Sequence, residues 1–309
     1  MFVAVSSCLM GNPVRYDGKS KANAYVMEQL AKHCEFLTLC PEHVAFGTPR
    51  QTIHVQHNLD NAVQPLSVVE NEQKADVTAE LLSAIDTQIV AMREANVCGV
   101  ILKSKSPSCG YGSTPVFVNG LQANVANGLF TEAILANYPY LPMIEETDLN
   151  DEWHRELFLT EMFVYQEILA ISLEKTSFEK LCAFHQKHQH LLALKNPQLM
   201  TKMKDLLAEL LIEYHPQSVA NYLLRAQQAL ATKAYIDDFV AVFKQLLSEL
   251  PKPSQTDLQE AITAFQMKQL SYATIAGLFR TQLEANGQSD YLETSILNPY
   301  LDDLATRTY

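Results

Sequence analysis

Three of the six cysteines in this 309-residue chain lie in sequence surroundings that favour metal chemistry. Cys8, Cys40 and Cys109 are flanked by glycine, proline and serine, whereas a cysteine of a plain apolar core does not need polar neighbours. Soft thiolates bind zinc or iron–sulfur clusters. Catalytic zinc takes three protein ligands and a water, and a cluster on three cysteines leaves one iron open, so the donor set admits both metals. The separations of 32 and 69 residues carry no ligand signature of their own.

The other three cysteines fit a structural interpretation. Cys34 and Cys98 each stand next to the start of a predicted strand, at the end of the sheet away from the three candidate ligands. Cys182 stands in the helical pattern Leu181-Cys182-Ala183-Phe184. Because a lone cysteine most often behaves as a small buried hydrophobe, we expect these side chains in the core.

The elements that must position the candidate ligands alternate between strand and helix. Apolar runs of strand length and stretches of helical periodicity alternate at residues 2–5, 24–33, 36–39, 77–95, 99–102, 131–137 and 141–144. This alternation, with uniformly apolar strands, predicts a Rossmann-like α/β domain with a mainly parallel sheet covered by helices on both faces. Cys8, Cys40 and Cys109 each follow a strand, and loops beyond the carboxyl ends of parallel strands form the binding crevice. The three thiols are therefore expected to meet at one edge of the sheet.

Composition divides the chain into two predicted domains. Eight of the ten glycines, eight of the thirteen prolines and five of the six cysteines precede residue 148, which indicates elaborate loops in the first half. The remainder is nearly free of glycine and has the pattern of successive helices. We predict an α/β domain over residues 1–147 and an all-α accessory domain over residues 148–309, with a polar run at residues 147–151 supplying a helix N-cap.

Hydropathy and net charge indicate where in the cell the protein acts and which partners it can bind. The chain is 48% hydrophobic, but it contains no apolar segment of the roughly 20 residues needed to span a bilayer. Residues 1–5 lack the basic stretch and long apolar run of a signal peptide. We expect a cytoplasmic protein with reduced cysteines and no membrane partner. The net charge of −12 opposes attraction to nucleic acid, so any RNA contact requires a local basic patch.

The residues around the three cysteines resemble the motifs of the thiouracil desulfidase family. The first motif corresponds to Ser6-Ser7-Cys8-Leu9-Met10-Gly11 followed by Val14-Arg15-Tyr16-Asp17-Gly18. The second corresponds to Cys40-Pro41-Glu42 with Gly47-Thr48-Pro49-Arg50, and the third to Leu102-Lys103-Ser104 with Ser106-Pro107-Ser108-Cys109-Gly110. In that family three cysteines hold a [4Fe-4S] cluster whose open iron takes sulfur from a thiolated uracil. The resemblance implies that Cys8, Cys40 and Cys109 are the ligands here.

Polar residues near the ligands are candidates for the other roles that this chemistry needs. Hydrolytic removal of sulfur needs a thiophile, a water nucleophile and a proton donor. Glu42 is expected to deprotonate the water, and Ser106 to bind substrate or pass a proton. Arg15, Asp17 and Lys103 are candidates for contacts to the base or to a phosphate. A structural interpretation remains open for Glu42 as a helix N-terminal charge or ion-pair partner, and for Ser106 and Asp17 as turn residues.

The second half resembles a helical domain found fused to desulfidases. Phe184-His185-Gln186-Lys187-His188 corresponds to its opening motif, and Leu292 with Leu297-Asn298-Pro299-Tyr300 to its closing motif, whereas residues 221–229 depart from its usual lysine-rich helix. Fused proteins of this kind act on thiouridine in transfer RNA, which implies 4-thiouridine in tRNA as the substrate. An RNA-binding face would be built from basic residues, namely Lys187, Lys195, Lys202 and Lys204 with Arg15 and Lys103. Against it, residues 148–309 hold 14 basic and 21 acidic residues, a net charge of −7.

Two alternatives to a tRNA desulfidase remain. One is the same chemistry on free thiouracil or its nucleoside, with the helical half serving stability or dimerisation. The other is a non-catalytic regulator that senses iron or oxygen, but a sensor has no need of the acid–base pair Glu42 and Ser106. We expect no cysteine or carboxylate to complete a metal site with His185, His188 and His190, and we expect a surface cluster or an RNA-facing helix there.

Overall fold

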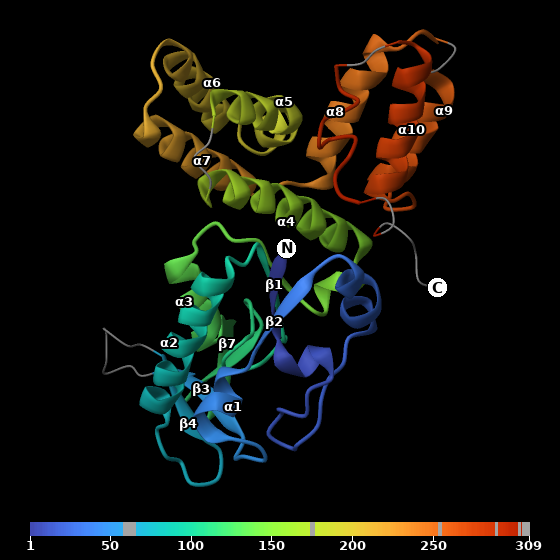
Figure 1. Cartoon of the computed structure of the whole chain (residues 1–309). Helices are drawn as coiled ribbons and strands as arrows, with labels where there is room; N and C mark the ends of the chain where they lie inside the picture. The colour runs from blue at the N-terminus through green and yellow to red at the C-terminus, as the bar shows by residue number, and fades with distance from the viewer. Residues whose placement is uncertain (58–65, 174–176, 253–254, 288–289, 302–303, 305–309) are drawn as a thin grey trace. The chain divides into compact units, whose positions relative to one another are not determined.

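The chain folds into two compact units, Met1–Asn150 and Asp151–Tyr309. A computed structural model describes residues 1–57, 66–173, 177–252, 255–287, 290–301 and 304 (Figure 1). The boundary lies three residues after the one expected from composition, because the short 3₁₀ helix η4 (Asp148–Asn150) groups with the first unit. No helix among these residues is both long enough and apolar enough to cross a membrane.

A four-stranded parallel sheet forms the centre of the first unit. Its strand order is β2-β1-β5-β8, and every neighbouring pair is parallel. The strands are β1 (Phe2–Ser6), β2 (Glu35–Leu39), β5 (Gly99–Leu102) and β8 (Met143–Glu145). The central strands β1 and β5 are almost entirely buried, as their uniformly apolar sequences require. The predicted α/β class with a mainly parallel sheet is confirmed.

A second four-stranded sheet was not predicted. Its order is β4-β3-β6-β7, with antiparallel pairs at both edges and a parallel pair between β3 and β6. The strands are β3 (Ile53–His57), β4 (Leu66–Glu70), β6 (Thr114–Val118) and β7 (Leu121–Ala126). The sequence predicted no strand in these segments. The two hairpins β3–β4 and β6–β7 join into one sheet through partners distant in the chain, as in the parallel pairing of Val55 with Val116.

Helices of the first unit pack on the parallel sheet and on one another (Figure 1). They are α1 (Pro41–Phe46), α2 (Thr78–Ala95) and α3 (Leu129–Asn137). The helix expected at residues 24–33 is instead a π-helix, η2 (Tyr25–Gln29), followed by a 3₁₀ turn, η3 (Leu30–Lys32). Leu30 N–H there donates to the carbonyls of both Tyr25 and Val26, so the hydrogen-bond ladder widens by one residue and the α pattern is lost.

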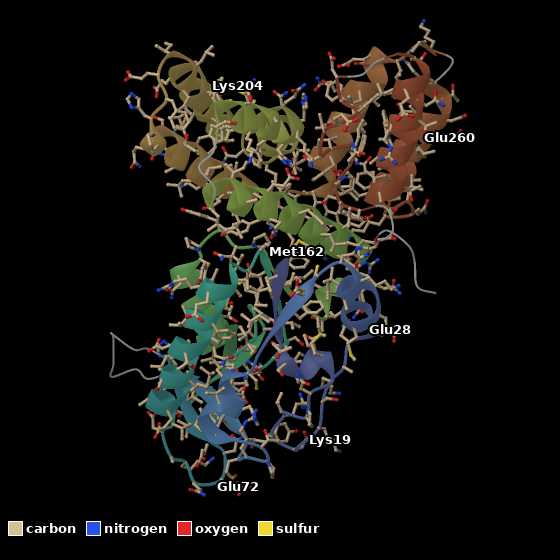
Figure 2. The ribbon with its side chains drawn as sticks, in the orientation of Figure 1. Lys19, Glu28, Glu72, Met162, Lys204 and Glu260 are labelled. Carbon is tan, nitrogen blue, oxygen red and sulfur yellow. The ribbon has the colours of Figure 1, made fainter. Side chains whose placement is uncertain are left out.

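The second unit is helical throughout its described elements. Its helices are α4 (Glu152–Leu173), α5 (Phe178–Lys195), α6 (Pro197–Ile212), α7 (Pro216–Leu230), α8 (Ile236–Glu249), α9 (Gln255–Gln266) and α10 (Tyr272–Ala285). Met162 of α4 is buried, whereas the labelled side chains of Lys204 and Glu260 are exposed (Figure 2). The predicted all-α class of this half is confirmed.

One buried carboxylate ties the closing motif of the second unit to its helices. Glu156 of α4 accepts hydrogen bonds from the backbone N–H of Tyr272 (2.7 Å) and Ala273 (3.0 Å), which begin α10. It also accepts a 2.5 Å hydrogen bond from the hydroxyl of Tyr300, the last residue of the closing motif. These contacts give the closing motif a structural role. The Glu156 carboxylate accepts from the first N–H groups of α10, which have no partner within the helix, and it also binds Tyr300.

Candidate functional site

A cavity of about 330 Å³ opens at the carboxyl ends of β1, β2 and β5. Cys8, Cys40 and Cys109 all line it, each contributed by the loop after one of these strands. Cys8 is 8% exposed and Cys109 is 5% exposed, and Cys40 is partly buried. The structure thus brings together the three thiols that the sequence places after three strands, while their role as ligands remains a prediction.

Local backbone geometry fixes the first two cysteines. Cys8 lies in the 3₁₀ turn η1 (Ser7–Met10), which ends at Gly11 with φ +82°, a left-handed conformation that glycine adopts without strain. Cys40 is the N-cap residue of α1, where Pro41 occupies the first helical position and fixes the entry of the chain. The Cys40 N–H donates to Oε1 of Gln88 in α2 at 3.1 Å, so a long helix anchors this ligand.

The loop that carries Cys109 docks on the N-terminus of α3. The carbonyl of Ser108 accepts from the backbone N–H of Phe130 (2.9 Å) and Thr131 (3.3 Å). The Thr131 hydroxyl donates to the Cys109 carbonyl at 3.0 Å. Gly128 makes this approach possible, because a Cβ there would lie 2.3 Å from the Ser108 carbonyl oxygen.

Gly128→Ala is therefore expected to displace the Cys109 loop. The added methyl group overlaps backbone atoms that cannot rotate away, so the free energy of unfolding should fall by about 1–3 kcal/mol, the usual cost of overpacking. Thermal unfolding and iron content after anaerobic reconstitution measure the effect. The control is Gly277→Ala in α10, where a Cβ meets nothing within 4 Å and alanine should stabilise the helix by about 1 kcal/mol. Equal stability and iron content in wild type and Gly128→Ala would contradict the packing argument.

Two consecutive glutamates at the end of β8 hold the other side of this loop. Oε1 of the buried Glu145 accepts from the backbone N–H of Tyr111 (2.6 Å) and the hydroxyl of Ser113 (2.5 Å). Glu146 accepts from Lys103 Nζ (2.5 Å) and from Ser104 N–H (2.6 Å). Neither glutamate was predicted to have a role. In the sequence they are marked only as two acidic residues that directly follow the apolar residues 141–144.

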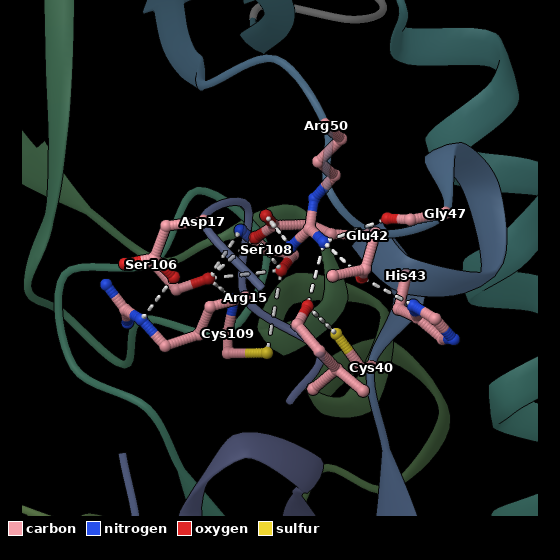
Figure 3. A network of polar contacts seen from close by, with 12 residues as sticks. Arg15, Asp17, Cys40, Glu42, His43, Gly47, Arg50, Ser106, Ser108 and Cys109 are labelled. Atoms are coloured by element: carbon pink, nitrogen blue, oxygen red, sulfur yellow. Dashed lines mark hydrogen bonds and ion pairs between the residues drawn. The ribbon is translucent and has the colours of Figure 1, made fainter. Parts of the chain in front are cut away.

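Glu42 lies at the centre of a polar network beside the thiols (Figure 3). Its Oε1 accepts from the hydroxyls of Ser106 (2.9 Å) and Ser108 (2.7 Å), and its Oε2 accepts from Arg50 Nη2 at 2.9 Å. Ser106 Oγ also accepts from the backbone N–H of Cys109 at 3.1 Å. The proposed base and the hydroxyl are thus in direct contact, and Glu42 is an ion-pair partner as well.

Arg50 and Ser108 belong to the second and third motifs, and both bind the Glu42 carboxylate. The Arg50 side chain is 5% exposed, and its Nη1 donates to the carbonyls of Val14 (2.8 Å) and Gly47 (3.1 Å). A guanidinium held at several points fixes the carboxylate it pairs with. Arg50 and Ser108 therefore position Glu42, and the two carboxylate oxygens face defined partners.

The candidates for substrate contact divide into two groups. Arg15 and Lys103 line the cavity, and Lys21 and Lys105 line it with them. Asp17 does not line the cavity. Its Oδ1 accepts a hydrogen bond from the backbone N–H of Lys19 in the same turn (3.1 Å). The Asp17 carboxylate also lies 3.7 Å from Arg15 Nε, so its contacts are those of a turn residue that orients Arg15.

The donor set fits an iron–sulfur cluster. Burial raises the pKa of the Cys8 thiol to about 12, with a further contribution from Cys109, while the charges of Arg15 and Lys103 act in the opposite direction. Burial likewise raises the pKa of Cys40 to about 12. No three His, Cys, Asp or Glu residues in the described ranges are grouped closely enough for a single ion; the three thiols instead surround a shared cavity. A bound metal removes the proton from such a thiol in spite of its raised pKa. Iron–sulfur clusters are held by cysteine thiolates, so the three sulfurs around this cavity suit such a group.

The histidines and lysines of α5 are engaged within the second unit. His188 is 1% exposed and its Nε2 lies 3.0 Å from Glu167 Oε2, which corrects the expectation of a surface position. Lys187 donates to the same glutamate at 2.6 Å. The Lys195 side chain is fully buried and pairs with Glu161 at 2.6 Å, so it cannot reach a phosphate. The apolar packing of this helix face decided these positions, which spacing in the sequence did not reveal.

The other lysines and histidines that were expected on a surface facing RNA have different surroundings from those of Lys195 and His188. Lys202 and Lys204 are exposed on α6. His185 Nδ1 lies 2.9 Å from the Tyr222 hydroxyl, and burial lowers its pKa to about 4. His190 stacks on Tyr291 with ring centroids 4.5 Å apart. Among the described residues, no group of three His, Cys, Asp or Glu side chains gathers here to hold a metal ion.

Comparisons with known proteins find similarity over the first unit. Residues 3–146 match the family model of 2-thiouracil desulfurase. The uncharacterised protein YbbK of Bacillus subtilis is 27% identical over 151 residues, which are 48% of this chain and 98% of YbbK. A solved structure, the [4Fe-4S]-dependent thiouracil desulfidase TudS, is 27% identical and covers 48% of this chain and 93% of its own, with a TM-score of 0.39. The expected resemblance of the N-terminal half to thiouracil desulfidases is confirmed by the family match.

Proposed function

We propose that this protein is an iron–sulfur-dependent desulfidase that hydrolytically replaces the sulfur of a thiolated uracil by oxygen and releases sulfide. The observation that carries the proposal is one cavity lined by three thiols and by the network of Glu42, Ser106 and Arg50. The family match over residues 3–146 supports the same activity. When bound to the three cysteines, a [4Fe-4S] cluster supplies a thiophilic Lewis-acidic iron without a protein ligand.

Glu42 is suited to take the proton of the attacking water. A carboxylate has about four lone-pair positions. Oε1 uses two of them for the hydroxyls of Ser106 and Ser108, and Oε2 uses one for Arg50, which leaves a position on Oε2 for water. The Glu42 side chain is 12% exposed, so water can reach it from the cavity. Arg50 holds the carboxylate in a fixed orientation, which is what a general base requires.

Ser106 is suited to pass a proton or to hold the substrate. Its hydroxyl contacts Glu42 and lines the cavity, so it connects the base to the reacting groups. A proton taken by Glu42 can return through this hydroxyl to the departing sulfur. The atoms balance: water contributes the oxygen, C=S becomes C=O, and sulfide leaves with no net change in oxidation state.

The substrate that we propose is 4-thiouridine in transfer RNA. Three basic side chains around the cavity, Arg15, Lys21 and Lys105, support a phosphate-bearing substrate in a chain that is otherwise acidic, whereas Lys103 Nζ is paired with Glu146. Lys202 and Lys204 of the second unit are exposed and can add to RNA attraction. The burial of Lys195 and the pairing of Lys187 favour the alternative, free thiouracil or its nucleoside, because they weaken the basic face.

The distinguishing experiment compares thiolated tRNA, 4-thiouridine and 4-thiouracil as substrates of the full chain. If tRNA is the substrate, its desulfuration should be fastest and should fall steeply with salt. K202E/K204E should then lower the tRNA rate by about ten-fold at low salt and leave the free-base rate unchanged. The control is K244E/K252E, the same charge change at other exposed lysines of the second unit. Preference for the free base with no salt-dependent binding of tRNA would make the helical unit a structural partner.

A further inference from the structure

Tyr16 is the one aromatic side chain among the described residues that line the cavity. It is 41% exposed, so the core of the first unit does not depend on burying its ring. The aliphatic side chains of the lining are those of Val14, Leu39 and Pro107. Binding sites for flat ligands combine aromatic surface with a few polar groups, and a ring left half open to a cavity suits that role better than packing.

Main-chain hydrogen bonds hold Tyr16 in a tight turn beside the cavity. The Arg15 N–H donates to the Lys19 carbonyl at 3.1 Å, and the Gly18 N–H donates to the Arg15 carbonyl at 2.9 Å. Gly18 has φ +70°, a conformation that glycine adopts without strain. The Tyr16 carbonyl accepts from the Arg50 N–H at 3.0 Å. These contacts set the place of Tyr16, and a change of its side chain leaves them intact.

Arg50 connects this turn to the proposed base. Besides the backbone contact to Tyr16, its Nη1 donates to the Val14 carbonyl (2.8 Å) and its Nη2 to Glu42 Oε2 (2.9 Å). One residue thus fixes the segment that carries the ring and the carboxylate that activates water. A flat substrate resting on Tyr16 would keep a constant orientation relative to Glu42, and a constant orientation is what a reacting pair requires.

The Arg15 guanidinium lies over the Tyr16 ring, with Cζ 5.4 Å from the ring centroid. Arg15 is itself oriented, because its Nε lies 3.7 Å from Asp17 Oδ1. A cation over one face restricts the motion of the ring. A flat ligand would then stack on the opposite face, as nucleobases do on aromatic side chains.

We propose that Tyr16 is a specificity-determining residue that stacks on the pyrimidine ring of the thiolated uracil. Stacking recognises the flat ring itself, whether it is free or joined to ribose, and leaves its edge available to Glu42 and Ser106. The inference rests on the proposed function and adds the side chain that holds the substrate ring.

The test is steady-state kinetics of the anaerobically reconstituted full chain with 4-thiouracil, 4-thiouridine and thiolated tRNA. Tyr16→Phe keeps the ring and should keep the KM of wild type. Tyr16→Ala and the bulkier Tyr16→Leu lack a flat face and should raise KM by about ten-fold for all three substrates, with iron content unchanged. The control is Tyr235→Ala, which removes an exposed tyrosine of the second unit that also has a cation, Lys233 Nζ, 5.0 Å from its ring centroid. This control should keep the wild-type KM.

A binding measurement separates stacking from turnover. In Glu42→Gln protein, where turnover is slow, bound 4-thiouracil should show the weakened thiocarbonyl absorption of a stacked ring, and adding Tyr16→Ala should remove this change. Wild-type KM in Tyr16→Ala and Tyr16→Leu, or an equal loss in Tyr16→Phe, would overturn the proposal. So would an effect confined to tRNA, which would place the contact on a neighbouring nucleotide. Wild-type protein that desulfurates none of the three substrates is a different outcome, because it refutes the proposed function itself.

Discussion

Cys109→Ala protein prepared without oxygen is expected to be colourless, whereas wild type should be brown and hold about four iron and four sulfide per chain. Cys109 is 5% exposed in a loop held by α3 on one side and by Glu145 on the other. No rearrangement of this fixed loop can bring another thiol to the same position. The two thiols that remain, from Cys8 and Cys40, would leave the cluster with one protein ligand fewer, so desulfidase activity should fall to background.

Matched controls come from the remaining cysteines. Cys98 is fully buried in the same unit, where its thiol donates to the Phe2 carbonyl at 3.2 Å at the beginning of β1. Cys34→Ala, Cys98→Ala and Cys182→Ala should therefore retain the visible absorption, iron and sulfide of wild type. Full iron content in Cys109→Ala would contradict the ligand assignment, and one stoichiometric zinc in colourless wild type would contradict the cluster.

Glu42→Gln is expected to lower the desulfuration rate by roughly 100-fold or more while leaving the cluster intact, the usual scale for a lost general base. The amide keeps the size of the carboxylate. Its oxygen can accept from Arg50 in place of Oε2, and its NH₂ group can donate to the hydroxyls of Ser106 and Ser108. The network is thus satisfied, but no atom in it can accept a proton from water at neutral pH.

The structural control for this prediction is Ser106→Ala. It removes one contact to Glu42 and should lower the rate less than Glu42→Gln, because Ser108 and Arg50 still hold the carboxylate. Iron content and visible absorption measured beside the rate separate catalysis from cluster loss. Near-wild-type turnover in Glu42→Gln with a full cluster would assign the base to another group.

The sequence by itself determined the parallel sheet, the helical second half and the position of three cysteines after three strands. These features depend on local signals, because a run such as residues 99–102 is apolar throughout and must be buried whatever its neighbours are. Apart from residues 24–33, the bounds of the predicted elements differ from the observed ones by at most two residues. The helix at residues 24–33 was wrong in type, since the structure has a π-helix followed by a 3₁₀ turn there, and apolar periodicity does not distinguish these from an α-helix.

Tertiary structure alone decided the second sheet and the partners of the site. The contact of Ser106 with Glu42 joins residues 64 positions apart, and that of Lys103 with Ser6 joins residues 97 positions apart. Glu145 binds a loop that lies 32 to 34 positions before it. Sequence patterns report which side chains share one face of a local element, whereas hydrogen-bond partners depend on how distant elements dock. Burial of Lys195 and His188 was decided in the same way, by packing between helices and not by spacing along one of them.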